Sequence, residues 1–278
     1  MWVRAVFSVV GVDRFETDLQ IAADLCADAG AHLSVLVVAL ASPPPIGSYA
    51  AVLSDPWREE RENDLVRLGE CTQQIESLIA KIPVSASLDR EYTEMAWADL
   101  IIGERGRYAD LTVIGPDLLS DDELRSRAID GALFTSGKPL LILPGLGTSA
   151  LHPKTVLLAW DSRLAAVRAV REALDIMRNA DQVHVTIVDP EATTGRDGPE
   201  PGADIAAYLA RHDIKVVVDR LPSAGVAIAD VLRRHARDIA ADVVVMGAYG
   251  HSRMRQRIFG GVTRAMIEKI TLPLFLAR

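Results

Sequence analysis

Short apolar runs, rich in β-branched residues, alternate along the chain with longer stretches whose apolar residues recur at helical spacing. The short runs are typical of strands buried on both faces, and the longer stretches are typical of amphipathic helices. In the N-terminal half the expected strands are Val3–Val10, His32–Leu40, Val84–Leu88, Leu111–Ile114 and Leu140–Leu143, and the expected helices are Thr17–Ala29, Pro56–Lys81, Tyr92–Glu104 and one that opens at Ile129–Thr135.

The C-terminal half repeats this alternation. Its expected strands are Thr155–Trp160, Val183–Val188, Lys215–Val218, Val243–Met246 and Leu272–Leu276, and its expected helices are Ala165–Arg178, Ile205–His212, Ala227–Ile239 and one after Gly261. The polar segment Asp189–Gly202 is expected to be a loop. Strands that alternate with helices indicate parallel sheets with helices on both faces.

Three landmarks occur in the same order in both halves. Ala109–Gly115 matches Ala241–Gly247, Lys138–Leu143 matches Leu272–Ala277, and Asp13 matches Asp161. The chain therefore reads as a tandem duplication with its joint in the Pro/Gly/Ser-rich stretch Pro144–Ser149. We expect one domain over residues 1–146 and a second over residues 152–278.

The fourth strand of the second copy leads into a glycine-rich segment. Gly247 and Gly250 follow the strand Val243–Met246, and Gly260 and Gly261 precede a helical pattern. This order brings backbone N–H groups and the positive end of a helix dipole close to an anion. The Lys-Ser/Thr pair of a Walker loop is absent, and the spacing is not that of the dinucleotide fingerprint. The segment predicts a phosphate site, with a merely flexible connection as the alternative.

The spacing Gly247-x2-Gly250-x9-Gly260, followed by a helix and the strand Leu272–Leu276, resembles the universal stress protein family. The resemblance covers the whole chain, is strong in the second half and is degenerate in the first. It implies an α/β fold: two tandem copies of a doubly wound, five-stranded parallel-sheet domain, which is adenine nucleotide alpha-hydrolase-like and Rossmann-like. In the nucleotide-binding branch Ser or Thr follows the third glycine, whereas this chain has Gly261, with Thr263 further on.

The resemblance implies an adenine nucleotide, ATP or AMP, with or without Mg²⁺, in the C-terminal half. The binding residues that it implies are Ala159, Trp160, Asp161, Val188, Met246, Gly247, Gly250, His251, Arg253, Gly260, Gly261, Val262 and Thr263. Two simpler interpretations stay open: Asp161 caps the following helix, and His251 and Arg253 belong to a solvated basic loop.

The first copy departs from this pattern. Pro116, Asp117 and Leu118 follow Gly115, so the second glycine is absent. The acidic run Asp121–Glu123 places negative charge where phosphates would lie. We therefore expect at most one nucleotide per chain, and a first copy that is structural or binds a partner.

Composition excludes several classes of partner. The net charge of −8 and the isoelectric point near 5.3 argue against non-specific nucleic-acid binding and against docking on an anionic membrane. No run approaches the roughly 20 apolar residues of a membrane span, and the short apolar N-terminus lacks a cleavage site. A cytoplasmic location is expected. Cys26 and Cys71 are interpreted as buried structural thiols in a reducing compartment.

No catalytic or metal-binding motif is visible among the six histidines or elsewhere, so the chain is expected not to be an enzyme. Slow, incidental ATP hydrolysis stays open. The leading hypothesis is a nucleotide-binding regulator of a stress response. The alternatives are a ligand-free interaction module with a protein partner and an ATPase or kinase-like enzyme. We expect the last strands, Leu140–Leu143 and Leu274–Ala277, to pair and form an internal pseudo-dimer, and a homodimer of the whole chain stays open.

Overall fold

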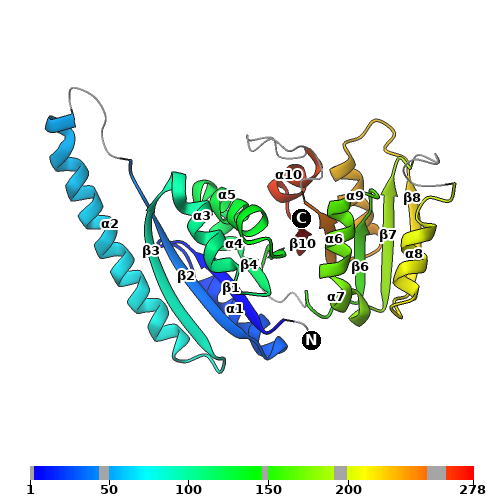
Figure 1. Ribbon diagram of the computed structural model, residues 1–278, viewed down its shortest axis with the longest axis horizontal. Coiled ribbons are helices and arrows are strands. Elements are labelled where there is room, and N and C mark those ends of the chain that lie inside the picture. Colours follow the sequence, from blue (N-terminus) through cyan, green and yellow to red (C-terminus); the bar gives the residue numbers. More distant parts are fainter. Residues whose placement is uncertain (1–2, 44–49, 146–149, 191–198, 249–260) are drawn as a thin grey trace. The chain divides into compact units, whose positions relative to one another are not determined.

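The computed structural model describes residues 3–43, 50–145, 150–190, 199–248 and 261–278, with the backbone alone at 50–55. The chain divides into two compact units, Met1–Lys138 and Pro139–Arg278. The described residues form ten strands in an α/β arrangement, which confirms the expected fold class (Figure 1). Among the described helices, none combines the length and apolarity needed to cross a membrane.

The first unit contains four parallel strands in the order β3-β2-β1-β4. These strands are β1 (Ala5–Val10), β2 (His32–Ala41), β3 (Ala86–Glu94) and β4 (Leu111–Ile114). Its helical segments are α1 (Glu16–Ala29), α2 (Ala50–Ile79), α3 (Met95–Gly106), α4 (Pro116–Leu119), α5 (Asp122–Asp130) and the π-helical turn η1 (Gly131–Ser136).

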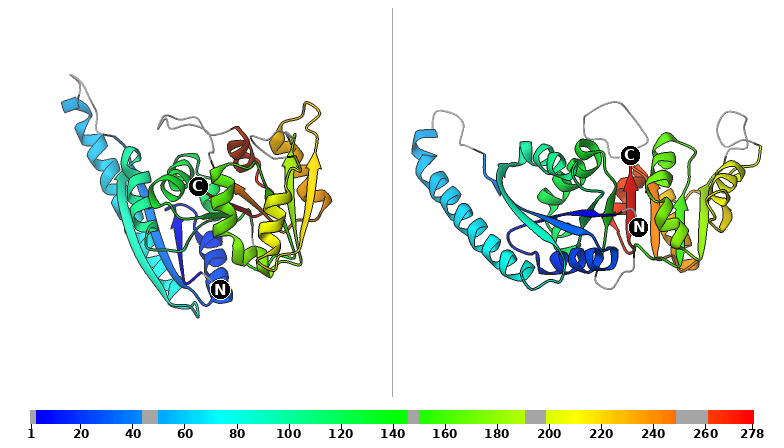
Figure 2. Two further views of the ribbon diagram at one scale, coloured as in Figure 1. Left: turned by 45° about the vertical axis from the view of Figure 1, so that its right-hand side comes forward. Right: turned by 60° about the horizontal axis from the view of Figure 1, so that its bottom comes forward.

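The second unit contains six strands in the order β5-β10-β9-β6-β7-β8. They are β5 (Leu140–Ile142), β6 (Thr155–Ala159), β7 (Gln182–Val188), β8 (Val216–Leu221), β9 (Val243–Gly247) and β10 (Leu274–Ala277). The helices are α6 (Leu164–Glu172), α7 (Leu174–Asn179), α8 (Ala203–Ala210), α9 (Ile228–Asp238) and α10 (Gly261–Glu268). Among the described residues, β10 with β9, β9 with β6, β6 with β7 and β7 with β8 pair in parallel, and β5 pairs antiparallel with β10 (Figure 2).

The predicted pairing of the two last strands is confirmed. β5 lies antiparallel to β10, with Leu140 opposite Leu276 and Ile142 opposite Leu274. Phe275, in the middle of β10, is fully buried. Both strands are apolar throughout, so pairing removes two edges that would otherwise expose unpaired backbone groups.

An aspartate before the fourth strand of each copy repeats the same contact. Asp110 accepts the backbone N–H of Ala5 at 3.0 Å, and Asp242 accepts that of Thr155 at 2.8 Å. In both copies this carboxylate satisfies a backbone donor at the start of the first strand. The shared contact supports the duplication that the sequence indicates.

Several predicted boundaries are wrong. Tyr92–Glu94 belong to β3, because β2 offers ladder partners as far as Ala41. α2 begins before Pro56, a residue that usually marks a helix start. The helix expected to open at Ile129 instead begins at Asp122, after the N-cap residue Asp121. The helix expected over Ala165–Arg178 is interrupted between α6 and α7.

Both cysteines are buried, and burial raises the pKa of Cys26 to about 12 and that of Cys71 to about 11. Because the thiolate is the reactive form, both thiols should be almost inert towards a disulfide reagent at pH 8 in the native protein. We expect full reaction of both only after denaturation. Rapid release of thionitrobenzoate from Ellman's reagent by native protein would contradict this.

Candidate functional site

The candidate site lies at the carboxyl ends of the parallel strands in the second unit. β6 runs between β7 and β9, and Ala159 at its end is in register with Thr186 and Met246. The chain proceeds from β6 to β7 on one side and returns to β9 on the other. Ligands of doubly wound sheets bind at such a reversal of strand order.

Trp160 and Asp161 follow β6 directly. The Trp160 N–H donates to the Thr186 carbonyl at 2.9 Å, which fixes the exit of the chain from the strand. The Asp161 carboxylate accepts the backbone N–H of Arg163 at 3.1 Å and is otherwise exposed, with the Arg163 guanidinium 3.8 Å away. One oxygen of Asp161 thus closes the turn before α6.

Val188 ends β7 and is half-buried. The next residue, Asp189, adopts a left-handed backbone with φ of 51°. Its carboxylate accepts the Ser223 N–H at 2.7 Å, and the bonding to Ser223 lowers the pKa of Asp189 below its ordinary value. This link joins the ends of β7 and β8 and holds Val188 at the edge.

Gly247 has a packing role that the sequence did not reveal. A Cβ at this position would lie 2.5 Å from the carbonyl carbon of Ala165 and from the nitrogen of Ala166. The glycine therefore lets the first turn of α6 approach the end of β9. Met246 beside it is buried, and the Ala248 N–H donates to the Ala277 carbonyl at 2.8 Å.

Gly261 begins α10, is exposed and has open space where a Cβ would stand. Val262 is half-buried, while Thr263 is only 4% exposed, so its hydroxyl lies within the packing of α10. The other predicted site residues, which are Gly250, His251, Arg253 and Gly260, lie outside the described residues.

The corresponding edge of the first unit is hollowed by a cavity of about 570 Å³. Its charged lining consists of six carboxylates and two arginines: Asp13, Glu60, Asp64, Asp117, Asp121, Glu123, Arg14 and Arg67. Arg67 is engaged by Asp13 at 2.7 Å. A cavity with this excess of negative charge opposes a polyphosphate.

Two aspartates of the first unit cap one another's helices. Asp18 in α1 accepts the backbone N–H groups of Asp117 and Leu118 at 2.8 and 2.9 Å. Asp117 in turn accepts the backbone N–H of Thr17 at 2.8 Å. An internal carboxylate therefore occupies the backbone donors that follow β4.

Among the described residues of the second copy, no carboxylate is among the atoms nearest to the corresponding glycine, Gly247. A Cβ on Gly115 would meet Asp18, whereas a Cβ on Gly247 would meet Ala165 and Ala166. The position that faces the glycine after the fourth strand is thus acidic in the first copy and apolar in the second. Ala166 has no side-chain acceptor for backbone N–H groups.

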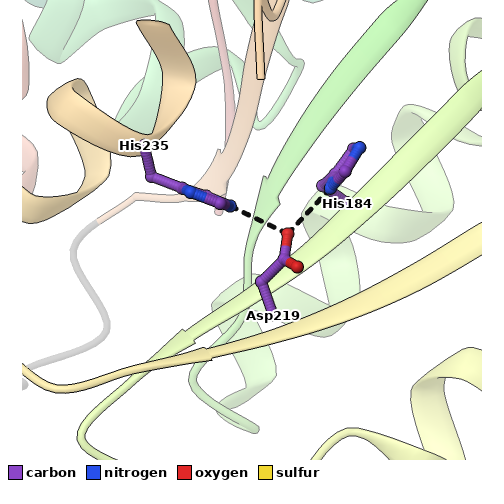
Figure 3. A group of neighbouring side chains, drawn as sticks. All are labelled: His184, Asp219 and His235. Atoms are coloured by element: carbon purple, nitrogen blue, oxygen red, sulfur yellow. Dashed lines mark hydrogen bonds and ion pairs between the residues drawn. The ribbon is translucent and has the colours of Figure 1, made fainter. Parts of the chain in front are cut away.

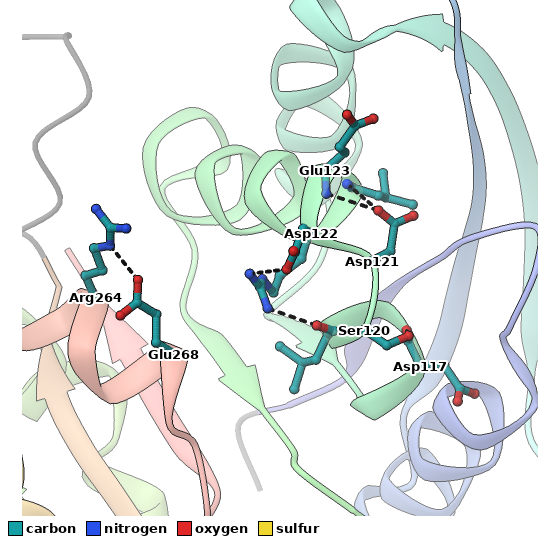
Figure 4. Close-up of polar contacts among 10 residues, drawn as sticks. Asp117, Ser120, Asp121, Asp122, Glu123, Arg264 and Glu268 are labelled. Carbon is teal, nitrogen blue, oxygen red and sulfur yellow. Dashed lines mark hydrogen bonds and ion pairs between the residues drawn. The ribbon is translucent and has the colours of Figure 1, made fainter.

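The acidic run Asp121–Glu123 is partly explained by helix formation. Asp121 accepts the N–H groups of Glu123 and Leu124 at 3.1 and 3.0 Å, so it is the N-cap of α5 (Figure 4). Asp122 forms an ion pair with Arg125 at 2.6 Å. Asp121 and Glu123 also line the cavity, whereas Asp122 does not.

A second group of polar side chains was missed by the sequence interpretation. His184, Asp219 and His235 bring their ligand atoms within 4.8 Å of one another (Figure 3). They come from β7, β8 and α9, at sequence separations of 35 and 16 residues. No short metal-binding spacing connects them, so only the fold brings them together.

The sequence model of the universal stress protein family matches residues 153–278. No curated protein matches the chain. A universal stress protein of Archaeoglobus fulgidus is similar in structure over 100% of this chain and 99% of its own, at 18% identity and a TM-score of 0.67. A putative universal stress protein of Pseudomonas aeruginosa matches 99% of this chain and 93% of its own, at 17% identity and a TM-score of 0.55.

One further similar protein is a universal stress protein solved in complex with cAMP. It covers 46% of this chain and 98% of its own, at 20% identity and a TM-score of 0.35. The two longer structures share the fold over essentially the full length of this chain. The family model matches the second copy by its amino-acid sequence. Residues 153–278 therefore belong to the universal stress protein family, and the whole chain has the tandem α/β fold of the two-domain proteins to which it is similar.

Proposed function

We propose that this protein is a cytoplasmic stress-response regulator that binds ATP or AMP, with or without Mg²⁺, in its C-terminal half. It does so without meaningful turnover. The proposed site comprises Trp160 and Asp161 after β6, Val188 at the end of β7, Met246 and Gly247 at the end of β9, and the start of α10. Ala159, Val262 and Thr263 flank these positions, and Gly250, His251, Arg253 and Gly260 complete the motif in sequence.

The observation that carries the proposal is the contrast between the two copies at the glycine after strand four. In the first copy Asp18 occupies the backbone donors beyond Gly115. In the second copy Ala165 and Ala166 take that place and offer no carboxylate. Backbone donors between a strand and a helix attract an anion, and the described residues beside Gly247 offer none, which supports an external anion in the second copy.

A ligand-free interaction module is the second candidate. Two observations favour it: Gly247 is explained by its contact with α6, and Gly261 carries no hydroxyl. An exposed apolar set on the first unit, Trp97, Leu100 and Tyr108, is compatible with a protein partner. Calorimetry that shows no heat with millimolar ATP and Mg²⁺ would favour this candidate.

The proposal predicts one binding event per chain, weakened by a change in the second copy alone. Asp161 and Asp13 follow the first strands of their copies and are both exposed, at 56% and 78%. We expect Asp161→Ala to weaken ATP binding about 10-fold, because a hydrogen bond to a charged group contributes roughly 1.5 kcal/mol. Asp13→Ala is the matched control and should leave the affinity unchanged in isothermal titration calorimetry.

Two equivalents of ATP per chain, or a loss caused by Asp13→Ala alone, would contradict the assignment to the second copy. Hydrolysis should be negligible beside the roughly 1 to 1,000 s⁻¹ of typical enzymes. A phosphate-release assay that reached that range would support the ATPase interpretation instead.

Gly261→Ser should strengthen nucleotide binding. No atom lies within 4 Å of a Cβ at this position, so serine fits without rearrangement. The hydroxyl adds one hydrogen bond, worth about 1 kcal/mol, which corresponds to roughly a 5-fold lower Kd. Gly261→Ala is the control that adds a Cβ without a hydroxyl. Equal affinities of the serine and alanine variants would show that the hydroxyl meets no phosphate.

A further inference from the structure

We propose that His184, Asp219 and His235 form a binding site for a divalent transition-metal ion, with zinc as the best-matched metal. The site is separate from the proposed nucleotide site, because its residues belong to the interior of β7, the interior of β8 and helix α9. The inference does not depend on whether the protein binds a nucleotide.

The three side chains converge on one point. Oδ2 of Asp219 lies 2.7 Å from Nδ1 of His184 and 2.8 Å from Nε2 of His235. Figure 3 shows both imidazole rings pointing their nitrogen atoms at the same carboxylate oxygen. The two rings stand edge to face, with centroids 6.2 Å apart. Two imidazoles and one carboxylate are thus already gathered around a small volume.

The spacing suits a tetrahedral ion after a small adjustment. Zinc bonds to histidine nitrogen and carboxylate oxygen are about 2.0–2.2 Å long, so tetrahedral ligand atoms stand roughly 3.4 Å apart. The N···O distances here are somewhat shorter than that, and the three ligand atoms lie within 4.8 Å of one another. Side-chain rotations that move each ligand atom by a few tenths of an ångström would let an ion replace the two hydrogen bonds.

The electrostatics and access also suit a cation. Each side chain is partly buried, at 15%, 20% and 15% exposed for His184, Asp219 and His235. Partial burial strengthens the attraction between the carboxylate and a divalent ion. The remaining exposure leaves a path for the ion and a fourth position for water. Two imidazoles with one carboxylate favour zinc or a neighbouring transition metal over Mg²⁺ or Ca²⁺, which prefer oxygen ligands.

The first copy provides an internal comparison. By strand register, Ser34 corresponds to His184 and Asp89 to Asp219. Gly103 precedes β4 by the same number of residues as His235 precedes β9. Asp89 there pairs with Arg105 at 3.2 Å. The second copy keeps the aspartate and adds two imidazoles, so the cluster is not a general requirement of this fold.

The test is isothermal titration of the full chain, freed of metal by a chelator, with zinc chloride. We expect one tight site per chain in the wild type. His235→Ala and His184→Ala should each weaken that site at least about 100-fold, because each removes a direct ligand. His32→Ala is the matched control: it removes a strand histidine that bonds to Ser85 and Ser87 and should leave the tight site intact.

Cobalt(II) provides an independent readout, and in the wild type this readout does not depend on the stability of any variant. A tetrahedral cobalt site in the wild type should give intense visible absorption, which zinc abolishes by displacement. Asp219→Asn, which keeps a similar shape and removes the charge, should lose most of this absorption. Wild-type protein with no tight zinc site, or with a site that survives both histidine changes, would overturn the proposal and leave a purely hydrogen-bonded cluster.

Discussion

Gly247→Ala should lower the free energy of unfolding of the second unit by about 3 kcal/mol, at the upper end for overpacking a close contact. The new methyl group would stand 2.5 Å from the backbone of Ala165 and Ala166. These are backbone atoms of α6 and cannot rotate away as a flexible side chain can. The strand end or the helix must move, and both border the proposed nucleotide site.

Gly261→Ala is the matched control, because it is the same change in the same unit. Its Cβ meets open space and it stands at the first position of α10. Alanine there should be neutral or stabilise by up to about 1 kcal/mol through a less flexible unfolded chain. Urea unfolding followed by circular dichroism measures both variants. If the two variants unfold at the same urea concentration, the close approach of α6 to β9 is wrong.

Lowering the pH should increase the contribution of the buried Asp18 carboxyl group to the stability of the folded protein. Burial raises the pKa of Asp18 from 3.8 to about 6, against the opposing effect of the N–H groups of Leu118 and Asp117. The unfolded chain releases this proton near pH 4, and the folded protein near pH 6. Between these values the folded state binds more protons, so the contribution of Asp18 to stability is full below pH 4 and is lost as the pH rises to 6.

Asp18→Asn isolates this effect, because it removes the titrating group and keeps a similar shape. The amide group also turns a donor towards the N–H of Asp117 or Leu118, which costs about 1–3 kcal/mol at any pH. With a shift of about two units, the stability gap between wild type and variant should widen by about 3 kcal/mol from pH 7 to pH 4. Asp130, whose pKa burial also raises to about 6, is common to both proteins.

Urea unfolding at a series of pH values measures the gap. A gap that is constant with pH would show that Asp18 has an ordinary pKa in the folded protein. A gap that narrows towards pH 4 would mean that the backbone donors outweigh burial, and that the carboxylate is held ionised.

The sequence predicts the architecture well, because local periodicity and the duplication both depend on the order of residues along the chain. The strand Leu111–Ile114 follows from its apolar run, and the first helix ends at Ala29 as expected, before the left-handed residue Gly30. The pairing of β5 with β10 follows from two apolar strands at equivalent chain positions. Errors occur where ladder partners extend a strand, as at Tyr92–Glu94.

The polar contacts within the sites are harder to predict from the sequence, because they join residues that are far apart along the chain. Asp18 and Asp117 stand about a hundred residues apart, and neither lies in a motif. From the sequence, Gly247 is equally consistent with a phosphate contact and with a packing role. Its packing role is evident only from the contact with α6 in the structure. His184 and His235 appear as isolated histidines in a strand and a helix, and Asp219 joins them only after folding.

Because α1 and α4 cap one another, the stability of the first unit does not depend on the concentration of an external anion. Its helix-start donors are satisfied by a carboxylate that is covalently part of the chain, at a concentration that dilution cannot change. A unit that uses an external anion for the same donors gains stability as RT ln(1 + [L]/Kd), and so follows the supply of that anion. Under the proposed nucleotide binding, the stability of the first copy is set by its own residues, and the stability of the second copy rises with the nucleotide concentration.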